Sequence, residues 1–146
     1  MRALIQRVNQ ASVEVDGSTI SSIQSGLLVL LGCGKGDTTS QLEPLAKKIA
    51  NLRIFADDSG RSNRSLLDVA GSALVVSQFT LYADTSRGNR PGFSEALEPE
   101  AAKQLYLDFM QALKGLGVSE VRGGEFGAYM KVKLENDGPV TISLEI

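Results

Sequence analysis

Strand-like patterns of apolar and polar residues dominate the first 31 positions of the chain. Residues 3–8 have strand character, and residues 11–15 alternate with the period of two that is typical of a β-strand. Asp16-Gly17 is a hairpin turn signal, so residues 18–23 are expected to return antiparallel. Residues 26–31 form a continuous apolar run, which predicts a central strand buried on both faces. The sheet is therefore expected to begin with an antiparallel meander and not with a strand–helix–strand unit.

Two segments have the apolar periodicity of an amphipathic helix. The first is predicted from Ser40 to Phe55, with a capping-box pattern over residues 40–43. The second begins near Pro99, which suits the first turn of a helix, and ends at Gly117. The apolar stripes of the two helices are Leu42, Leu45, Ala46, Ile49, Leu52 and Phe55, and Ala102, Leu105, Phe109, Leu113 and Leu116.

Short strands and polar connections account for the rest of the chain. Residues 72–76 are apolar and partly β-branched, which indicates a buried strand. The other expected pieces are a polar loop at 61–65 anchored by 66–69, strands at 118–121, 129–135 and 140–146, and a turn at 136–139. Many strands with two helices predict one α+β domain over residues 1–146. Its sheet is expected to be curled, mainly antiparallel and barrel-like, with the two main helices packed outside.

The composition constrains the possible chemistry more than it constrains the fold. Of the 146 residues, 42% are apolar and 22% are charged, and no apolar run approaches the ~20 residues that cross a bilayer. There is no histidine, which excludes Ser-His-Asp and Cys-His arrangements and zinc sites built on imidazole. The only cysteine, Cys33, is expected to pack as a small apolar residue. A lone cysteine and a start without the features of a secretory signal fit a cytoplasmic protein.

Net charge narrows the range of partners. The chain has 15 basic and 17 acidic residues, a formal net charge of −2. This balance argues against sequence-blind coating of nucleic acid, which needs a strongly basic face. It is compatible with recognition of one RNA end through a small basic patch. No membrane or DNA partner is expected.

The strongest candidate for a site follows the strand at 72–76. There the chain changes from apolar to polar at Ser77-Gln78-Phe79-Thr80, where a strand end would present groups for chemistry. Thr80 is the candidate side chain, as nucleophile or as positioning donor, although a threonine nucleophile needs a base beside it. Alternatively, the backbone N–H groups of Phe79 and Thr80 form an oxyanion hole. A third interpretation is a strand-end threonine that is satisfied locally.

Two further stretches are candidates for binding. Arg87 and Arg90 lie in a polar, glycine-bearing loop, and they are either solvated or bind phosphate near the first site. Gly138-Pro139 is either an ordinary turn or a cis peptide. A cis bond would point both carbonyl groups the same way and give a rigid wall of acceptors that tests the groups on a substrate's α-carbon.

Cofactor and metal sites are not expected. Residues 32–36 are glycine-rich and lie between a strand and a helix, but Asp37 stands where a dinucleotide-binding loop would need glycine. No Gly-Lys-Ser/Thr ending of a phosphate-binding loop is present. Asp57, Asp58 and Asp68 are better explained as turn residues than as metal ligands.

Several motifs together resemble one family. Ser77-Gln78-Phe79-Thr80-Leu81 and Asn136-Asp137-Gly138-Pro139-Val140-Thr141 are similar to the paired signatures of D-aminoacyl-tRNA deacylases. Further matching stretches are residues 5–8, 11–13, 26–30, 51–55, 65–69, Arg90-Pro91 and Phe126-Gly127-Ala128. The positions Arg61-Ser62, Gly92 and Tyr129 depart from what is typical there and bear on fine substrate preference.

The resemblance implies an activity and an assembly. It implies a homodimer in which each active site joins the segment from Ser77 to Leu81 of one subunit to Gly138-Pro139 of the other, with Gly-Pro in cis as a chiral filter. The reaction would be hydrolysis of the ester between a D-amino acid, or mischarged glycine, and the terminal ribose of tRNA, with L-amino acids rejected sterically. The ribose 2′-hydroxyl would help to activate water. The other residues assigned on this basis are Phe126, Ala128, Met130, Val140 and Thr141 for substrate, and Arg7, Arg87 and Arg90 for tRNA.

Two other functions compete with this one. The first is a hydrolase of free D-amino acid esters, which would need no RNA and would show no phosphate-dependent salt effect. The second is a non-enzymatic dimeric binding module, in which the two signatures only build a subunit interface.

Overall fold

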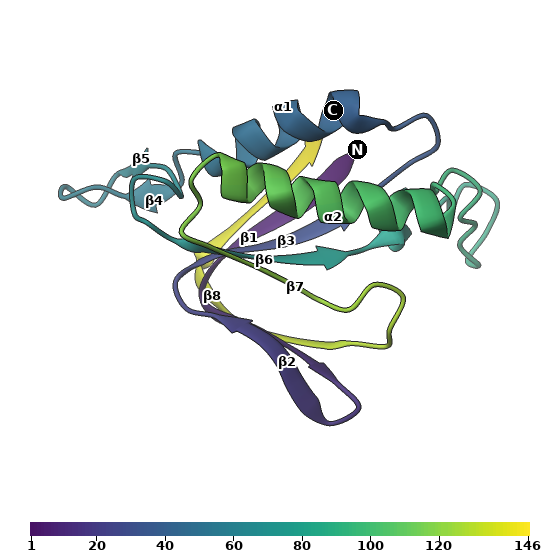
Figure 1. Ribbon diagram of the computed structural model, residues 1–146, viewed down its shortest axis with the longest axis horizontal. Coiled ribbons are helices and arrows are strands. Elements are labelled where there is room, and N and C mark those ends of the chain that lie inside the picture. Colours follow the sequence, from purple (N-terminus) through teal and green to yellow (C-terminus); the bar gives the residue numbers. More distant parts are fainter.

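A single curled sheet forms the centre of the molecule, and two helices pack on its outer face (Figure 1). The computed structural model describes residues 1–146. The sheet consists of β1 (Arg2–Val15), β2 (Ser18–Ile23), β3 (Gly26–Gly32), β6 (Ser72–Ser77), β7 (Glu120–Gly123) and β8 (Lys131–Glu145). Its order is β2-β1-β3-β6-β7, and β8 pairs with the other edge of β1. No helix is long and apolar enough to span a membrane.

The curl of the sheet brings the first and last strands of this order, β2 and β7, together. The hydroxyl of Ser21 in β2 donates to the carbonyl of Gly123 in β7 at 2.8 Å. The sheet is therefore nearly closed, and the expected barrel-like α+β fold is confirmed. One apolar cluster fills the space between sheet and helices, and a second, smaller one lies on the inner face of the curl around Val13, Leu28 and Leu74.

The first strand is longer than the sequence pattern indicates. Residues 3–8 and 11–15 belong to one continuous strand, β1, whose first half pairs with β3 and whose second half pairs with β2. The hairpin at Asp16-Gly17 is confirmed, since both residues have positive φ (50° and 79°), as hairpin turns of two residues require.

Two of the five strand pairs in the sheet are parallel, which the expected meander does not describe. The pairs β1–β2, β1–β3 and β1–β8 are antiparallel, but β3–β6 and β6–β7 are parallel. Parallel neighbours need long crossover connections, and the two helices supply them: α1 (Thr39–Ala50) lies between β3 and β6, and α2 (Pro99–Gly115) lies between β6 and β7. Both helices therefore cover the same face (Figure 1).

The boundaries of α1 differ from the prediction at both ends. Its capping box uses Thr38 and Gln41, not Ser40 and Glu43. The helix ends at Ala50 because Asn51 caps it, with its side-chain amide donating to the carbonyl of Lys47 at 2.8 Å. The chain beyond forms a small hairpin of β4 (Phe55–Ala56) and β5 (Ser62–Arg64), so the predicted polar loop at 61–65 is wrong.

The second helix agrees with the prediction. Pro99 is its first residue, and Gly117, with φ of 92°, lies just beyond its end. Leu105, Phe109 and Leu113 are buried as expected, and Tyr106 joins them.

The C-terminal segment is one strand, and the predicted turn at residues 136–139 is wrong. Along β8, Asn136 pairs with Val8 and Thr141 pairs with Gln6. Residues 137–140 therefore bulge opposite the single residue Arg7, and the strand continues in the same direction. Within this bulge the Gly138-Pro139 peptide is cis.

Candidate active site

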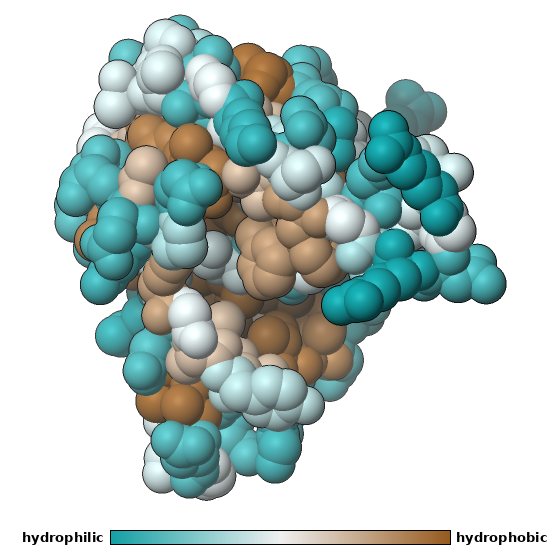
Figure 2. Space-filling view, turned by 90° about the vertical axis from the view of Figure 1, so that its right-hand side faces the viewer, coloured by the Kyte–Doolittle hydropathy of each residue, from teal (hydrophilic) through white to brown (hydrophobic).

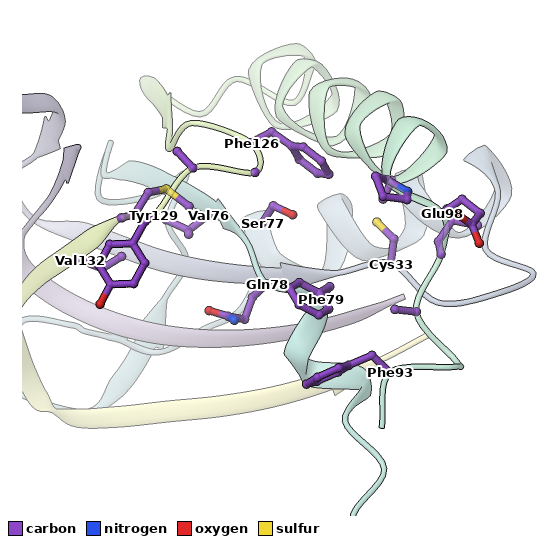
Figure 3. Close-up of a pocket in the computed structure, with 17 residues that line it drawn as sticks. Cys33, Val76, Ser77, Gln78, Phe79, Phe93, Glu98, Phe126, Tyr129 and Val132 are labelled. Carbon is purple, nitrogen blue, oxygen red and sulfur yellow. The ribbon is translucent and has the colours of Figure 1, made fainter. Parts of the chain in front are cut away.

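An apolar cavity of about 590 Å³ opens beside the end of β6 (Figures 2 and 3). One wall is the strand end itself, the opposite wall is the segment from Phe126 to Met130, and the first turn of α2 borders it. The lining residues are Cys33, Val76, Ser77, Gln78, Phe79, Phe93, Ala96, Leu97, Glu98, Pro99, Ala102, Phe126, Gly127, Ala128, Tyr129, Met130 and Val132. Figure 2 shows this face of the molecule, with brown, apolar side chains in its hollow and teal, hydrophilic ones around it.

The cavity brings together only part of the predicted site. Ser77, Gln78 and Phe79 line it, as do Phe126, Ala128 and Met130. Thr80 follows directly on the wall but is not a lining residue. The others that do not line it are Gly138, Pro139, Val140, Thr141, Arg7, Arg87 and Arg90.

Two backbone donors are unpaired at the tip of β6. The N–H of Gln78 still extends the sheet, donating to the carbonyl of Leu31 at 2.7 Å. A short 3-10 helix, η1 (Phe79–Tyr82), then begins, and its first internal bond runs from the N–H of Leu81 to the carbonyl of Gln78 at 3.3 Å. The N–H groups of Phe79 and Thr80 donate to no group of the chain. They are successive donors on an exposed turn, an arrangement suited to an oxyanion.

The Thr80 hydroxyl has no base beside it. It accepts a hydrogen bond from the side-chain amide of Gln78, which is a donor and takes no proton. The hydroxyl is thus oriented locally, and it has no acceptor in the chain for its own proton. This environment suits a positioning group better than a nucleophile.

The N-terminal strand β1 anchors the 3-10 turn η1. The guanidinium of Arg2 donates to the carbonyl of Leu81 at 3.0 Å and lies 4.4 Å from the centre of the Tyr82 ring. The Tyr82 hydroxyl donates to Asp37 at 3.2 Å. Burial, followed by the nearby Asp37 carboxylate, raises the pKa of Tyr82 to about 12, so this donor keeps its proton. A Cβ at Gly34 would overlap the Tyr82 ring, so this glycine of the stretch 32–36 serves close packing.

Cys33 lines the cavity but is not an activated thiol. It is buried, and desolvation raises its pKa to about 11, with the Asp37 carboxylate adding to the effect. The thiol is therefore protonated at neutral pH. Its expected role as a small packed residue is confirmed.

Tyr106 holds the opposite wall in place, and the sequence pattern did not single it out. Its hydroxyl lies 3.0 Å from the carbonyl of Val75 in β6 and 3.1 Å from that of Gly124. Its ring packs against Phe126 with centroids 6.0 Å apart. Tyr106 is the one tyrosine at helical spacing within the buried face of α2, a signal that a search restricted to aliphatic residues and Phe misses.

Gly138 and Pro139 lie on the exposed edge of the sheet, away from the cavity of their own chain. Arg7 holds the bulge: its Nε lies 2.9 Å from a carboxylate oxygen of Asp137 and 3.2 Å from the Asp137 carbonyl. An Nη of Arg7 also donates to the carbonyl of Ile54. With only 13% of its side chain exposed, Arg7 is committed to internal contacts, which speaks against the predicted contact with tRNA.

Arg87 and Arg90 are on the surface and make no ion pair within the chain. Their loop is closed by reciprocal backbone hydrogen bonds of 2.8 Å between Asp84 and Gly92. The next residue, Phe93, packs on Phe79 with ring centroids 4.9 Å apart. The arginine loop is thereby attached to the rim of the cavity.

The acidic residues at 57, 58 and 68 serve local structure. Asp57 accepts from the Ser59 hydroxyl at 2.6 Å and from two backbone N–H groups, and these hydrogen bonds hold its pKa at about 2. Asp68 accepts from the N–H and hydroxyl of Ser65, both at 2.8 Å. No group of three or more Cys, Asp or Glu side chains converges in a way that would hold a metal ion.

Similarity to known proteins identifies the family. The family model described as D-Tyr-tRNA(Tyr) deacylase matches residues 4–145. The chain belongs to this deacylase family, whose members are enzymes, specifically hydrolases. It is 62% identical to a D-aminoacyl-tRNA deacylase of Roseiflexus castenholzii over 99% of this chain and 92% of the relative. It is 57% identical to one of Thermosipho melanesiensis, covering 99% and 97%.

Solved structures agree with the fold of the family. A structure described as c-Myc DNA Unwinding Element Binding Protein matches with a TM-score of 0.95 and 44% identity, covering 100% of this chain and 99% of that one. A second, titled as a probable eukaryotic D-amino acid tRNA deacylase, matches with a TM-score of 0.84 at 17% identity, covering 99% and 98%. The resemblance noted in the sequence is confirmed.

Proposed function

We propose that this protein hydrolyses the ester bond of D-aminoacyl-tRNA, and of glycyl-tRNA mischarged on tRNA(Ala), releasing the free amino acid and tRNA. The observation that supports this most directly is the pair of unpaired N–H groups at Phe79 and Thr80. They lie beside an apolar cavity in a histidine-free member of a deacylase family. The reaction is a chiral proofreading step in translation, and we expect it to take place in the cytoplasm.

The two amides stabilise charge on the ester carbonyl. Water attacks the carbonyl carbon, and the negative charge that develops on its oxygen is held by the N–H groups of Phe79 and Thr80. One such donor contributes roughly a hundredfold to a thousandfold in rate in other enzymes. The C–O bond to the ribose then breaks, the ribose oxygen leaves with a proton, and the carboxylic acid is released.

Activation of water is assigned to the substrate. No histidine is present, Cys33 is protonated, and the Thr80 hydroxyl has no basic neighbour. The 2′-hydroxyl of the terminal ribose is adjacent to the ester and is available to orient the attacking water. Ser77 and Gln78 then act by shaping the site, and the Gln78 amide fixes the Thr80 hydroxyl.

Chirality is assigned to a second copy of the chain. In the proposed homodimer, Gly138 and Pro139 of one subunit face the Ser77–Thr80 tip of the other, flanked by Val140 and Thr141. Support comes from the exposure of this dipeptide and its absence from the cavity of its own chain. The wall leaves no room for an L side chain and holds the amino group of a D residue, while glycine enters because it has no side chain to exclude.

The cavity and the arginine loop would hold the rest of the substrate. Phe126, Ala128 and Met130 supply an apolar wall for the terminal nucleoside, and Arg87 and Arg90 contact phosphate. Arg7 is left out of this role because its guanidinium is occupied by Asp137 and Ile54.

The deciding experiment follows loss of ester from D- and L-tyrosyl-tRNA side by side. We expect hydrolysis of the D form at a rate at least a hundred times that of the L form. Equal rates would refute the chiral wall, and no hydrolysis of either would favour a binding module. Hydrolysis of a free D-tyrosine ester at a comparable rate, insensitive to salt, would favour a small-molecule hydrolase.

A DNA competitor belongs in the same assay, since one structurally similar protein is described as binding a DNA element. We expect single-stranded DNA of equal length to inhibit less than uncharged tRNA.

A further inference from the structure

An aromatic ring lies between the proposed catalytic turn and the arginine loop. Phe93 packs on Phe79 with centroids 4.9 Å apart and an interplanar angle of 67°. Whichever ring presents its edge in this T-shaped pair, at least one face of Phe93 is not covered by Phe79. Figure 3 shows Phe93 on the outer side of Phe79, on the side away from Phe126.

Burial does not explain this pair. Phe93 is 36% exposed and Phe79 is 54% exposed, and neither belongs to the buried core. Two exposed phenylalanines in contact at the mouth of a cavity form a small continuous apolar surface, and such surfaces are found at ligand-binding sites.

Two arginines lie in the loop that directly precedes the same ring. The reciprocal 2.8 Å hydrogen bonds between Asp84 and Gly92 close the loop immediately before Phe93. Arg87 and Arg90 are therefore carried on a loop whose root adjoins the aromatic pair. An exposed aromatic face on the same loop as arginines without an ion-pair partner is a combination that suits single-stranded nucleic acid, because bases stack on the ring and phosphates pair with the cations.

We propose that Phe93 is the stacking platform for the nucleobase that precedes the terminal adenosine of the tRNA, with Arg87 and Arg90 binding the adjoining phosphates. This inference rests on the proposed function and extends it by one nucleotide. Every tRNA ends in the single strand CCA, so the base in question is a cytosine. Stacking is tolerant of sequence, and the platform therefore recognises the common end of all tRNAs and leaves the amino acid to the rest of the site.

The test compares two substrates that differ only at the penultimate base. Both are acceptor-stem duplexes charged with D-tyrosine: one ends in CCA, and the other has an abasic ribonucleotide in place of the second cytidine. Stacking of one base contributes roughly fivefold to a hundredfold. We expect kcat/KM of the wild-type protein to be about tenfold higher for the intact end. In Phe93→Leu this ratio falls to about one, and in Phe93→Tyr it is retained.

The ratio separates stacking from a structural role, because a merely distorted site lowers kcat/KM on both substrates alike. Tyr129→Leu is the matched control: Tyr129 is 89% exposed at the other end of the opening (Figure 3), away from the arginine loop, and its loss should leave the ratio unchanged. A wild-type ratio of one overturns the proposal. So does a ratio that survives in Phe93→Leu, or one that disappears in Tyr129→Leu.

The arginines are tested through salt. Each phosphate contact on a single strand steepens the fall of log affinity with log salt by about 0.7. Arg87→Ala with Arg90→Ala should flatten the slope by about twice that amount and weaken both substrates equally. An unchanged slope removes the arginines from the proposal.

Failure of the proposed deacylase function can be distinguished from failure of the stacking proposal. If no D-aminoacyl-tRNA is hydrolysed, the same intact and abasic ends are compared uncharged, by fluorescence titration. If the wild-type protein binds the intact end more tightly than the abasic end and Phe93→Leu does not, the stacking platform is supported without catalysis. Equal Kd values for the two ends in the wild-type protein refute it.

Discussion

At the tip of β6 the chain leaves the interior of the sheet, between β3 and β7, whereas the β8 bulge interrupts pairing at an exposed edge. The tip is held from several sides, by the Leu31 carbonyl, Arg2, Tyr82 and Asp37. The bulge is held mainly by one side chain, Arg7, through Asp137 and Ile54.

The difference between the two regions matches what each is proposed to do. Donors that stabilise developing charge must already be in place, so they profit from a tip surrounded by fixed neighbours. A wall that faces a second molecule must be exposed, so it lies at an edge and depends on one buried guanidinium.

Removing the ribose 2′-hydroxyl of the substrate should give the largest loss of rate. This change tests the chemistry at the tip of β6 and does not involve the β8 bulge. With D-tyrosyl-tRNA ending in 2′-deoxyadenosine, we expect the single-turnover rate to fall about a thousandfold, within the range of acid–base contributions. Binding of the deoxy substrate, measured by inhibition, serves as the control and should change little. A rate within threefold of normal would place the activating group on the protein.

Gly138→Ala should distort the β8 bulge, and with it the proposed chiral wall, while leaving the tip of β6 intact. Gly138 has φ of 130°, and a Cβ there would lie 2.9 Å from the N of Val140 and 3.0 Å from its Cγ2. The backbone must shift, and a misplacement of about 1 Å can cost a hundredfold in rate. We expect such a loss in kcat/KM for D-tyrosyl-tRNA. The exposed Gly60→Ala, also at positive φ and without close neighbours, is the matched control.

Arg7→Met should show whether the guanidinium is structural. The Asp137 and Ile54 groups lose their partner, so the free energy of unfolding should fall by about 1–3 kcal/mol, measured by urea denaturation. Activity should fall about tenfold, but its dependence on salt should keep its slope. A flatter slope would restore Arg7 as a phosphate contact.

Thr80→Ala should have a small effect, because the backbone donor at Thr80 remains. We expect a loss of less than tenfold in kcat for D-tyrosyl-tRNA. Complete loss of activity in a variant with unchanged melting temperature would make the hydroxyl a nucleophile.

The smallest effect concerns Cys33. Its pKa rises from 9.0 in the unfolded chain to about 11 in the fold, so the folded state binds the proton more tightly. The stability that this contributes is fully present below pH 9 and is lost as the pH rises toward 11. Between these values the melting temperature of the wild type should fall more than that of Cys33→Ala. Parallel curves for the two proteins would contradict this assignment.

Much of the tip could be predicted from the sequence, and much less of the bulge. The abrupt change after Val76 is a local signal, so the strand, its end and the candidate amides of Phe79 and Thr80 follow from it. In the bulge, Asn136-Asp137-Gly138-Pro139 has the composition of a turn. Pairing of residues on both sides with β1 overrides this preference, and such long-range pairing has no local signature.

Other differences between prediction and structure also arise from contacts that have no local signature in the sequence. Phe55 continues the apolar spacing of α1, but Asn51 ends the helix, and Phe55 packs into the core from β4 instead. Phe93 reaches the rim of the cavity only through its tertiary contact with Phe79, so no spacing along the chain marks it.

The pairing of β1 with β8 has a consequence for biosynthesis. Arg2 lies opposite Glu145, so the long edge of β1 stays without a partner until β8 has left the ribosome. Meanwhile the nascent chain exposes an open strand edge, the kind of surface on which chains aggregate. A product that stops before β8 should therefore be insoluble.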